Sequence, residues 1–228
     1  MSNSILILAA HPDDEVLGCG GTIAKFADSG AIVHAAFLAD GVFSRIGDQA
    51  VQQAELNDRR KAAKSACNIL GVKSVSFGDF PDNRMDTIPL LDITQAVGIL
   101  IAQHQPEMVF THHAGDVNID HRRLHEAVVI ACRPQQGHHP VRTVLSFEVP
   151  SSTEWQFSGS APAFTPNWFV NISATLDRKL AALEAYAAEL RAWPHPRSRQ
   201  GVEHLAHWRG ATIGVDAAEA FILGRQLA

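Results

Sequence analysis

The sequence predicts an α/β fold, a three-layer αβα sandwich built on a mostly parallel, Rossmann-like sheet. Apolar and β-branched runs without alternation, as at residues 4–10 and 31–38, are typical of strands buried on both faces. Stretches with helical spacing of Ala and Leu lie between such runs. Nearly every polar cluster directly follows a predicted strand. Strands that alternate with helices indicate parallel pairing through right-handed crossovers.

Short apolar segments predict six strands along the chain. We expect them at residues 4–10, 31–38, 73–77, 107–111, 142–149 and 168–172. The run at 142–149 alternates moderately between apolar and polar residues, whereas the first two runs are continuous. Residues 151–167 hold Ser, Pro, Thr and Gly, so this segment is predicted to be irregular.

Helical spacing and chain breakers predict six helices. We expect them at residues 16–27, 49–70, 89–104, 120–132 and 175–192, with a last helix from near Ser198. Gly30 and Gly71 are suited to end the first two helices. Pro89 fits a first helical turn, and Pro134 limits the fourth helix. The segment 175–192 is rich in Ala, Leu and Glu, which favour helix.

Length and composition bound the class of protein. With 228 residues, 46% of them hydrophobic, the chain can bury a substantial core, and we expect one domain over residues 1–228. The 19 Lys and Arg against 24 Asp and Glu give a net charge of −5, which argues against nucleic-acid binding. The sequence contains no apolar run near the ~20 residues of a membrane span.

The cysteines and the N-terminal segment indicate a cytoplasmic protein. Cys19, Cys67 and Cys132 form no CxxC pair, which fits a reducing compartment and three inert core thiols. The apolar run at residues 5–10 is too short for a signal peptide, and no basic residue precedes it. Whether the chain forms a homo-oligomer is left open.

A first cluster of chemically active residues follows the first predicted strand. His11, Asp13 and Asp14 occupy a tight turn, where two adjacent carboxylates repel each other unless a positive charge lies near. His11 and Asp14 are three positions apart, so both can point to one side while Asp13 stays free. Such mixed nitrogen and oxygen ligands suit Zn²⁺. Capping of the following helix by aspartate is the alternative.

A second cluster follows the fourth predicted strand. Residues 111–121 contain three histidines and two aspartates. His121 and His125 lie one helical turn apart, and one of them is expected to be the third metal ligand. Three protein ligands with an open position are typical of catalytic zinc. Because parallel strands end at the same edge of a sheet, the two clusters are expected to meet.

Both clusters resemble those of the LmbE-like (PIG-L type) zinc-dependent de-N-acetylases. The resemblance rests on the segment from Ala10 to Glu15 with its glycine-rich continuation, and on the block from His113 to His121. It implies that His11, Asp14 and His121 are the zinc ligands, that Asp13 is the general base, and that Asp120 is a carboxylate supporting the ligand shell. Family members remove acetyl groups from N-acetylglucosamine-type sugars. The substrate implied is therefore a small N-acetylated sugar or glycoconjugate.

The chain departs from the family pattern in two places. Several members have a histidine where this sequence has Asn118, which can donate a hydrogen bond but cannot deliver a proton. We expect Asp13, Asp120 and Asn118 to act in catalysis, with the general acid open among His112, His113, His195 and Asp13. Members often carry Arg-x-x-Glu on the second helix, whereas Arg60 here is followed by Ala63.

The sequence offers a set of polar side chains for binding the sugar. The candidates are Arg60, Asp82, Asn83, Arg84, His113 and His195. Trp155 and Trp168 flank the irregular segment and are candidates for stacking on a sugar ring. The metal is expected to be Zn²⁺, although His/Asp sites also accept Fe²⁺ or Co²⁺.

Three other functions compete with de-N-acetylation. The stretch Gly18-Cys19-Gly20-Gly21 lacks the G-x-G-x-x-G spacing of a dinucleotide site, and acidic residues precede it. A metal hydrolase of another substrate class, such as a phosphoester hydrolase, uses the same residue types and often two metals. A catalytically silent sugar-binding protein would be consistent with Asn118.

Overall fold

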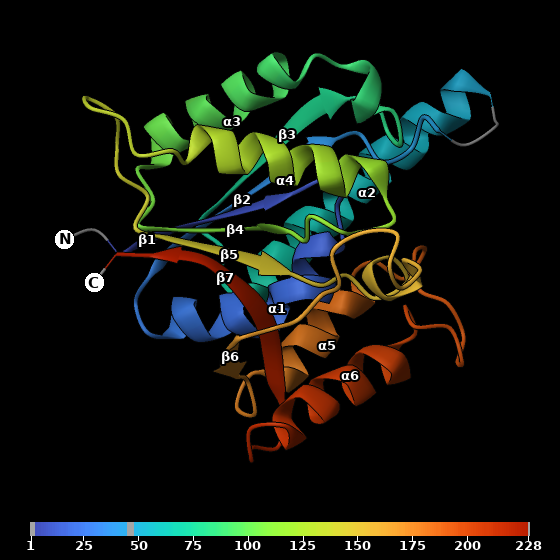
Figure 1. Cartoon of the computed structure of the whole chain (residues 1–228). Helices are drawn as coiled ribbons and strands as arrows, with labels where there is room; N and C mark the ends of the chain where they lie inside the picture. The colour runs from blue at the N-terminus through green and yellow to red at the C-terminus, as the bar shows by residue number, and fades with distance from the viewer. Residues whose placement is uncertain (1–2, 45–47, 228) are drawn as a thin grey trace.

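A seven-stranded sheet runs through the molecule in the order β3-β2-β1-β4-β5-β7-β6. The computed structural model describes residues 3–44 and 48–227 (Figure 1). The strands are β1 (Ser4–Ala9), β2 (Ile32–Ala39), β3 (Ser74–Phe80), β4 (Met108–His112), β5 (Thr143–Phe147), β6 (Trp168–Asn171) and β7 (Ala218–Gln226). The helices are α1 (Asp14–Asp28), α2 (Gln49–Leu70), α3 (Leu90–His104), α4 (Ile119–Ala131), α5 (Leu176–Glu184) and α6 (Arg199–Ala211), with 3-10 turns at Met85–Thr87 and Thr153–Trp155.

The strand order reverses at β1, which places a binding edge beside it. The strands from β3 to β5 are all parallel, and β1 has β2 on one side and β4 on the other. β7 pairs antiparallel with both β5 and β6. In open α/β sheets, ligands bind outside the carboxyl ends of the strands at such a reversal. The segments that follow β1 and β4 therefore meet there.

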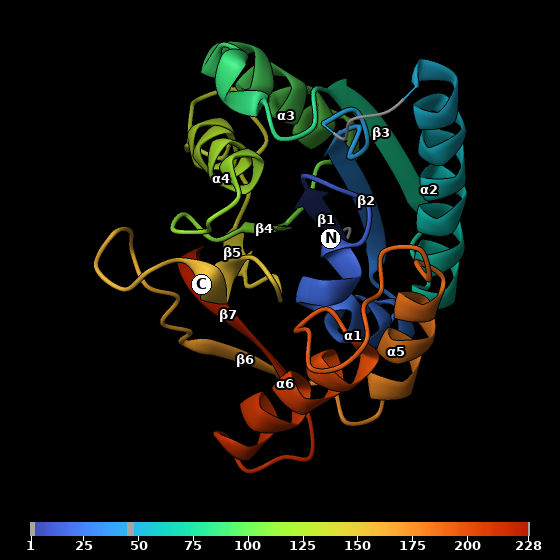
Figure 2. The same ribbon diagram turned by 90° about the vertical axis from the view of Figure 1, so that its right-hand side faces the viewer.

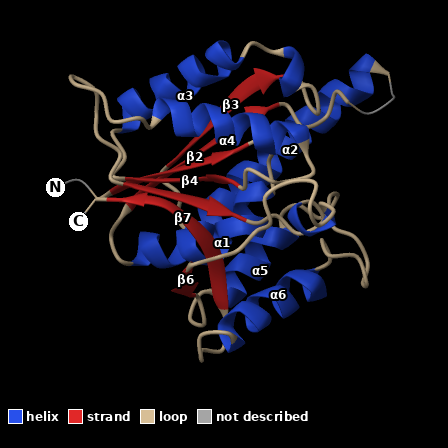
Figure 3. Ribbon diagram, viewed as in Figure 1, coloured by secondary structure: helices blue, strands red, loops and turns tan. Residues whose placement is uncertain are grey.

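Helices cover both faces of the sheet, which confirms the predicted three-layer sandwich. In Figure 1, α3 and α4 lie on one face and α1, α5 and α6 on the other. Figures 2 and 3 show the same layering, with α2 beside α5. One buried apolar cluster lies under α1, α2, α5 and α6, and a second lies under α3 and α4. Within the described ranges, no helix has the length and apolarity needed to cross a bilayer.

A buried ion pair supports a break within α1. The helix is interrupted at Cys19, which has φ −147° and ψ 21°. Glu219 of β7 accepts hydrogen bonds from the backbone N–H groups of Gly21 and Thr22, where the helix resumes. Lys179 of α5 donates to the Leu17 carbonyl and to Glu219. Two charges that are each only 3–4% exposed thus satisfy the backbone groups freed by the break.

Two predictions of secondary structure near the C-terminus were wrong. The helix expected at 175–192 ends at Glu184, and turns with i−3 hydrogen bonds follow, such as Tyr186 N to Leu183 O at 3.0 Å. Tertiary contacts of the residues after Glu184 outweigh their helix propensity. β7 was not expected, because Glu219 interrupts an otherwise apolar run. Its pairing with Lys179 allows this carboxylate to lie inside the sheet layer.

Candidate metal centre

Three candidate metal ligands converge at the carboxyl ends of β1 and β4. His11, Asp14 and His121 each offer one ligand atom, and these atoms lie within 4.8 Å of one another. Asp14 Oδ2 is 3.4 Å from Nδ1 of His11 and 3.3 Å from Nε2 of His121. All three residues are buried. The tight turn after β1 and the N-terminal turn of α4 bring them together, as the sequence predicted.

Buried atoms without partners show that this cluster fits a cation. Among the described residues, Asp14 Oδ1 and His121 Nε2 have no hydrogen-bond partner. Leaving such atoms buried and unpaired costs about 1–3 kcal/mol each. One imidazole nitrogen and one carboxylate oxygen pointing into the same space match the donor set of a divalent metal. The residues present therefore fit the group that the motifs indicated.

Asp120 fixes the orientation of His11. The Nε2 atom of His11 lies 2.9 Å from Asp120 Oδ2 and 3.2 Å from Asp82 Oδ1. Asp120 is fully buried, and it also accepts hydrogen bonds from the backbone N–H groups of Asn83 and Met85. An imidazole that donates through Nε2 presents Nδ1 as a free ligand. This arrangement matches the supporting role that the family resemblance implied for Asp120.

Asp116 lies at ion-pair distance from the other ring nitrogen of His121. Its Oδ1 atom lies 3.2 Å from Nδ1 of His121, which leaves Nε2 directed at the ligand cluster. The hydroxyl groups of Ser152 and Thr153 donate to the Asp116 carboxylate. Burial alone would raise the pKa of Asp116, but His121 and the two hydroxyls outweigh it and hold the pKa well below its ordinary value. No role was assigned to Asp116 from the sequence, although it lies within the second motif block.

The electrostatics of the cluster favour positive charge. Burial lowers the pKa of His121, yet the carboxylates of Asp14 and Asp116 outweigh this effect and raise the pKa to about 9. In the absence of a metal, the site therefore retains a proton on this imidazole. A divalent cation would take the place of that proton, so metal binding and deprotonation of His121 are coupled.

Asp13 stands beside the ligands with its side chain free of the helix. It occupies the N-cap position of α1 but makes no capping hydrogen bond through its carboxylate. Its φ of 113° lies in the positive region, a conformation that costs a non-glycine residue on the order of 1–3 kcal/mol. Burial raises the pKa of Asp13 to about 6, partly offset by Arg197 and Arg59. The capping alternative therefore does not describe Asp13.

A cavity of about 410 Å³ opens over the cluster. Of the predicted site residues, it is lined by His11, Asp13, Asp14, Asp82, Asn83, Asn118 and His121, and by the stacking candidate Trp155. Asn118 caps α4 by accepting the N–H of Asp120, and its amide nitrogen donates to Asn83 Oδ1 at 3.2 Å. The oxygen of Asn118 is thus used by the helix, so this side chain presents only N–H donors toward Asn83 and the cavity.

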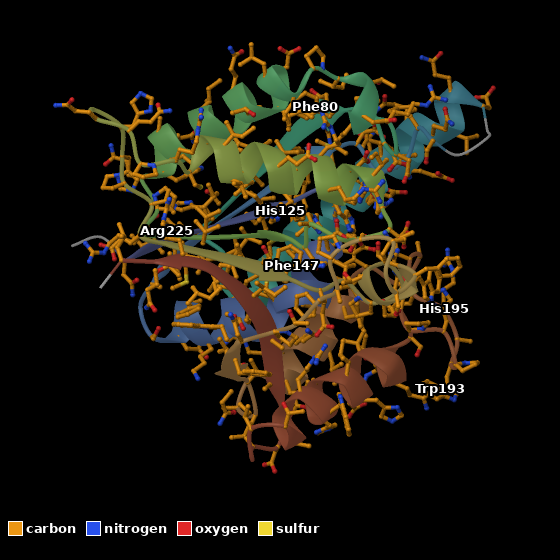
Figure 4. The ribbon with its side chains drawn as sticks, in the orientation of Figure 1. Phe80, His125, Phe147, Trp193, His195 and Arg225 are labelled. Atoms are coloured by element: carbon orange, nitrogen blue, oxygen red, sulfur yellow. The ribbon has the colours of Figure 1, made fainter. Side chains whose placement is uncertain are left out.

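The cavity lining does not include Arg60, Arg84, His113, His195 or the stacking candidate Trp168. Arg60 pairs with Asp79 at 2.7 Å on the outside of α2, and Arg84 is exposed. His113 is buried against the Pro162 carbonyl at 2.8 Å. Figure 4 shows His195 beside Trp193 at the margin of the molecule, and its Nδ1 accepts the N–H of Arg197. Their roles in substrate binding remain predictions.

His125 is likewise outside the cluster, because its Nδ1 is bonded to the backbone. The distance from His125 Nδ1 to the His112 carbonyl oxygen is 2.8 Å. His112 in turn accepts the N–H of Ala10 through Nε2, and its ring stacks on His121 with centroids 3.8 Å apart. Of the two histidines left open by the sequence, His121 is the one that the fold brings to Asp14.

Two arginines of the cavity wall were missed by the sequence analysis. Arg59 donates to the carbonyl oxygens of Pro12 and Gly41, and it lies 3.7 Å from Asp13 Oδ2. Arg197 lies 3.3 Å from the same oxygen. Arg59 continues the buried stripe of Leu56 and Ala63 along α2, three and four positions away. That periodicity would have favoured Arg59 over its neighbour Arg60.

Fold and site together define a class of protein. Candidate imidazole and carboxylate ligands at the reversal point of a Rossmann-like sheet, with the Asp13 carboxylate beside them, fit a metal-dependent hydrolase. The family described as PIG-L: GlcNAc-PI de-N-acetylase matches residues 6–132. The chain belongs to this family, and the resemblance seen in its motifs is confirmed.

Individual relatives extend the likeness beyond the matched segment. The chain is 30% identical to the diacetylchitobiose deacetylase of Thermococcus kodakarensis over 81% of this chain and 69% of that relative. It is 30% identical to the 4-oxalmesaconate hydratase of Pseudomonas putida over 84% of this chain and 76% of the hydratase. The structure of N,N'-diacetylchitobiose deacetylase from Pyrococcus horikoshii matches with a TM-score of 0.78 at 21% identity, over 97% and 83% of the two chains. This last likeness concerns the fold alone.

Proposed function

We propose that this protein removes the acetyl group from an N-acetylated amino sugar or its conjugate. The observation that carries the proposal is the cluster of His11, Asp14 and His121 with the carboxylate of Asp13 beside it, where it does not cap the helix. The cavity of about 410 Å³ is within the ordinary size of a small-molecule site. The deacetylase among the relatives supports this substrate class.

The ligand set determines what a bound cation contributes. His11, Asp14 and His121 would hold a divalent metal, which supplies Lewis acidity and makes water nucleophilic near neutral pH. We propose Zn²⁺, since mixed imidazole and carboxylate ligands suit it, with Fe²⁺ or Co²⁺ as substitutes. Asp120 and Asp116 keep the two imidazoles oriented.

Asp13 carries the proton transfers in this proposal. Its carboxylate takes a proton from the water that attacks the acetamide carbon, and it returns that proton to the nitrogen as the C–N bond breaks. The products are acetate and a free amine. Because Asn118 presents an amide donor and no titratable group, it can hydrogen-bond the substrate but cannot supply the proton. Asp82 and Asn83 line the cavity, which supports assigning them to the binding of sugar hydroxyls.

The setting of the enzyme is also part of the proposal. We propose one catalytic domain over residues 1–228 that acts on a small soluble substrate in the cytoplasm. The three cysteines are free and buried, which fits a reducing compartment.

A second candidate function is the addition of water to a carbon–carbon double bond of a carboxylic acid. The hydratase relative favours it, because this chain is 30% identical to it over 84% of its own length. Arg59 and Arg197 also offer two guanidinium groups at the cavity, and guanidinium binds carboxylates in a bidentate manner. The same activated water and the same base would serve both reactions.

Acetate release from a panel of N-acetylated sugars tests the proposal. The panel holds free N-acetylglucosamine, its disaccharide, nucleotide-linked forms and glycosides, each with and without a chelator, and an unsaturated dicarboxylic acid monitored by absorbance. Chelator-sensitive acetate release that is lost in Asp13→Asn and retained in the exposed control Asp79→Asn is the expected result. Loss of absorbance without acetate release would favour the hydratase. If no compound reacts, the deacetylase proposal is contradicted for these substrate classes.

A further inference from the structure

The backbone of Asp13 is held in its positive-φ conformation by hydrogen bonds at both ends. Its carbonyl oxygen accepts the N–H groups of Val16 and Leu17 at 3.1 and 2.9 Å, which begin α1. Its own N–H donates to Glu15 Oε2 at 3.0 Å. A residue keeps such a conformation only where its surroundings determine it from several sides. The contact with Glu15 is the side-chain contribution to this restraint.

Glu15 is itself anchored from a distant part of the chain. Its Oε1 atom accepts the hydroxyl of Tyr186 at 2.6 Å, a contact that spans 171 positions. Glu15 is 0% exposed and Tyr186 is 2% exposed. Neither is among the residues that line the metal cavity. A buried carboxyl group that touches neither the cluster of ligands nor the cavity needs another explanation, because its burial is costly.

The opposite side of Asp13 is restrained by charge. Arg197 and Arg59 lie 3.3 and 3.7 Å from Oδ2 of Asp13. Since Glu15 fixes the backbone and the arginines approach one carboxylate oxygen, the direction of the side chain is set from two independent sides. An aspartate at the N-cap position ordinarily accepts a hydrogen bond from the first turn of the helix, but the Asp13 carboxylate makes no such bond.

We propose that Glu15, anchored by Tyr186, is a positioning residue that aims the carboxylate of Asp13 at the reacting water. Glu15 acts through the backbone N–H of Asp13 and does not touch the substrate. This inference rests on the proposed function, because it assumes that Asp13 is the base. It predicts that the geometry of Asp13, and not the binding of the metal, depends on Glu15.

Paired variants of Glu15 separate this role from a general effect on folding. Glu15→Met has a similar shape but no acceptor for the Asp13 N–H. Glu15→Gln keeps an oxygen for that N–H and an amide that can donate to the Tyr186 oxygen. We expect Glu15→Met to lower kcat by about ten- to a hundredfold at nearly unchanged KM, because small displacements of a catalytic group have effects of this size. We expect Glu15→Gln to restore most of kcat and Tyr186→Phe to fall between the two.

Metal content and structure complete the test. In Glu15→Met, the zinc content and the absorption spectrum of the Co²⁺ form should match those of wild type. Cys132→Ala, in the apolar cluster under α3 and α4, is the control for a general loss of stability: it should lower the melting temperature without lowering kcat. A crystal structure of Glu15→Met should show Asp13 out of the positive-φ region. The proposal is overturned if Asp13 keeps its φ and carboxylate position there, or if kcat falls only in proportion to metal content. If Glu15→Met does not fold, the same readouts on Tyr186→Phe decide. The structural readout needs no substrate, so it remains decisive even if wild type deacetylates no compound.

Discussion

Nε2 of His11 lies 2.9 Å from Oδ2 of Asp120, although 109 positions separate the two residues in the chain. This contact joins the turn after β1 to the first turn of α4. It leaves Nδ1 of His11 directed toward Asp14. A carboxylate behind a histidine ligand fixes the tautomer and raises the basicity of the metal-binding nitrogen. The relationship therefore makes a direct prediction about metal affinity.

Asp120→Asn should weaken metal binding while the fold is retained. Its amide N–H₂ would face the donors at Asn83 or Met85 or the ring of His11, so the restraint on His11 is lost. Loss of such a supporting carboxylate costs about 10- to 100-fold in metal affinity. Competition with a chromogenic chelator measures this, with Asp79→Asn as the exposed control. An unchanged dissociation constant would show that Asp120 does not support the ligand.

Glu15 should make the stability of the chelated protein fall as pH rises. Burial raises the pKa of Glu15 from its ordinary 4.5 to about 8, although the Tyr186 hydroxyl partly lowers it. Because the folded-state pKa is the higher one, the stabilising contribution is complete below pH 4.5 and is lost as the pH rises toward 8. The slope is about 1.4 kcal/mol per pH unit within this window. Glu15→Gln should make that slope shallower, as measured by denaturant unfolding at pH 5 and pH 8 in chelator, while Asp13 and His121, whose pKa values are also raised, keep the rest of it.

The comparison of Glu15→Gln with wild type decides whether Glu15 is the group that titrates. If Glu15→Gln and wild type lose stability in parallel between pH 5 and pH 8, Glu15 is not the group whose protonation changes there. The exposed control Asp79→Asn should keep the wild-type slope, because its carboxylate is solvated.

The three cysteines should be unreactive in the folded protein. Burial raises the pKa of Cys132 to about 12, and it also raises the pKa values of Cys19 and Cys67. The thiolate is the reactive species, so a disulfide reagent at pH 7.5 should react about a thousandfold more slowly than with an ordinary thiol. All three should react after unfolding in guanidinium. Rapid reaction of one equivalent under native conditions would contradict the burial of that thiol.

Lys179→Met should destabilise the protein strongly by leaving Glu219 as an unpaired buried charge. The pair is separated by 2.5 Å and both side chains are 4% exposed. Removing one partner of such a pair costs about 3–5 kcal/mol. The double variant with Glu219→Gln should recover part of this loss, because Gln can still accept one N–H of α1. A single variant as stable as wild type, measured by thermal unfolding, would argue against the support of α1 by this pair.

The sequence predicted the parallel strands and the meeting of the two motif clusters because both depend on local patterns, whereas the choice of His121 over His125 came from the family resemblance. Continuous apolar runs identify parallel strands, and the sites that follow β1 and β4 must then meet at one edge. Contacts across long sequence separations were not predictable in this way. Asp116 is held by the hydroxyl groups of Ser152 and Thr153, which belong to a segment predicted to be irregular. The strand β7 could not be predicted because it contains the charged Glu219, whose partner Lys179 lies on α5.

The arginine of α2 that lines the cavity is Arg59, one position away from the predicted Arg60. The sequence offers the neighbouring Arg60 as the candidate, but a shift of one position rotates a side chain by about 100° around a helix. Leu56 and Ala63 mark the buried face of α2, and Arg59 lies on it. Arg197 gave no comparable signal, because it lies in a turn whose path depends on the contacts of residues after α5.

Titration of the metal-free protein with Zn²⁺, followed by acetate release, tests the central claim most directly. The account predicts no activity after chelation, a linear rise with added Zn²⁺, and saturation at one equivalent per chain. His121→Ala should show neither the tight binding nor the recovery. Full activity in the chelated protein, or saturation only at two equivalents, would contradict a single catalytic ion held by His11, Asp14 and His121.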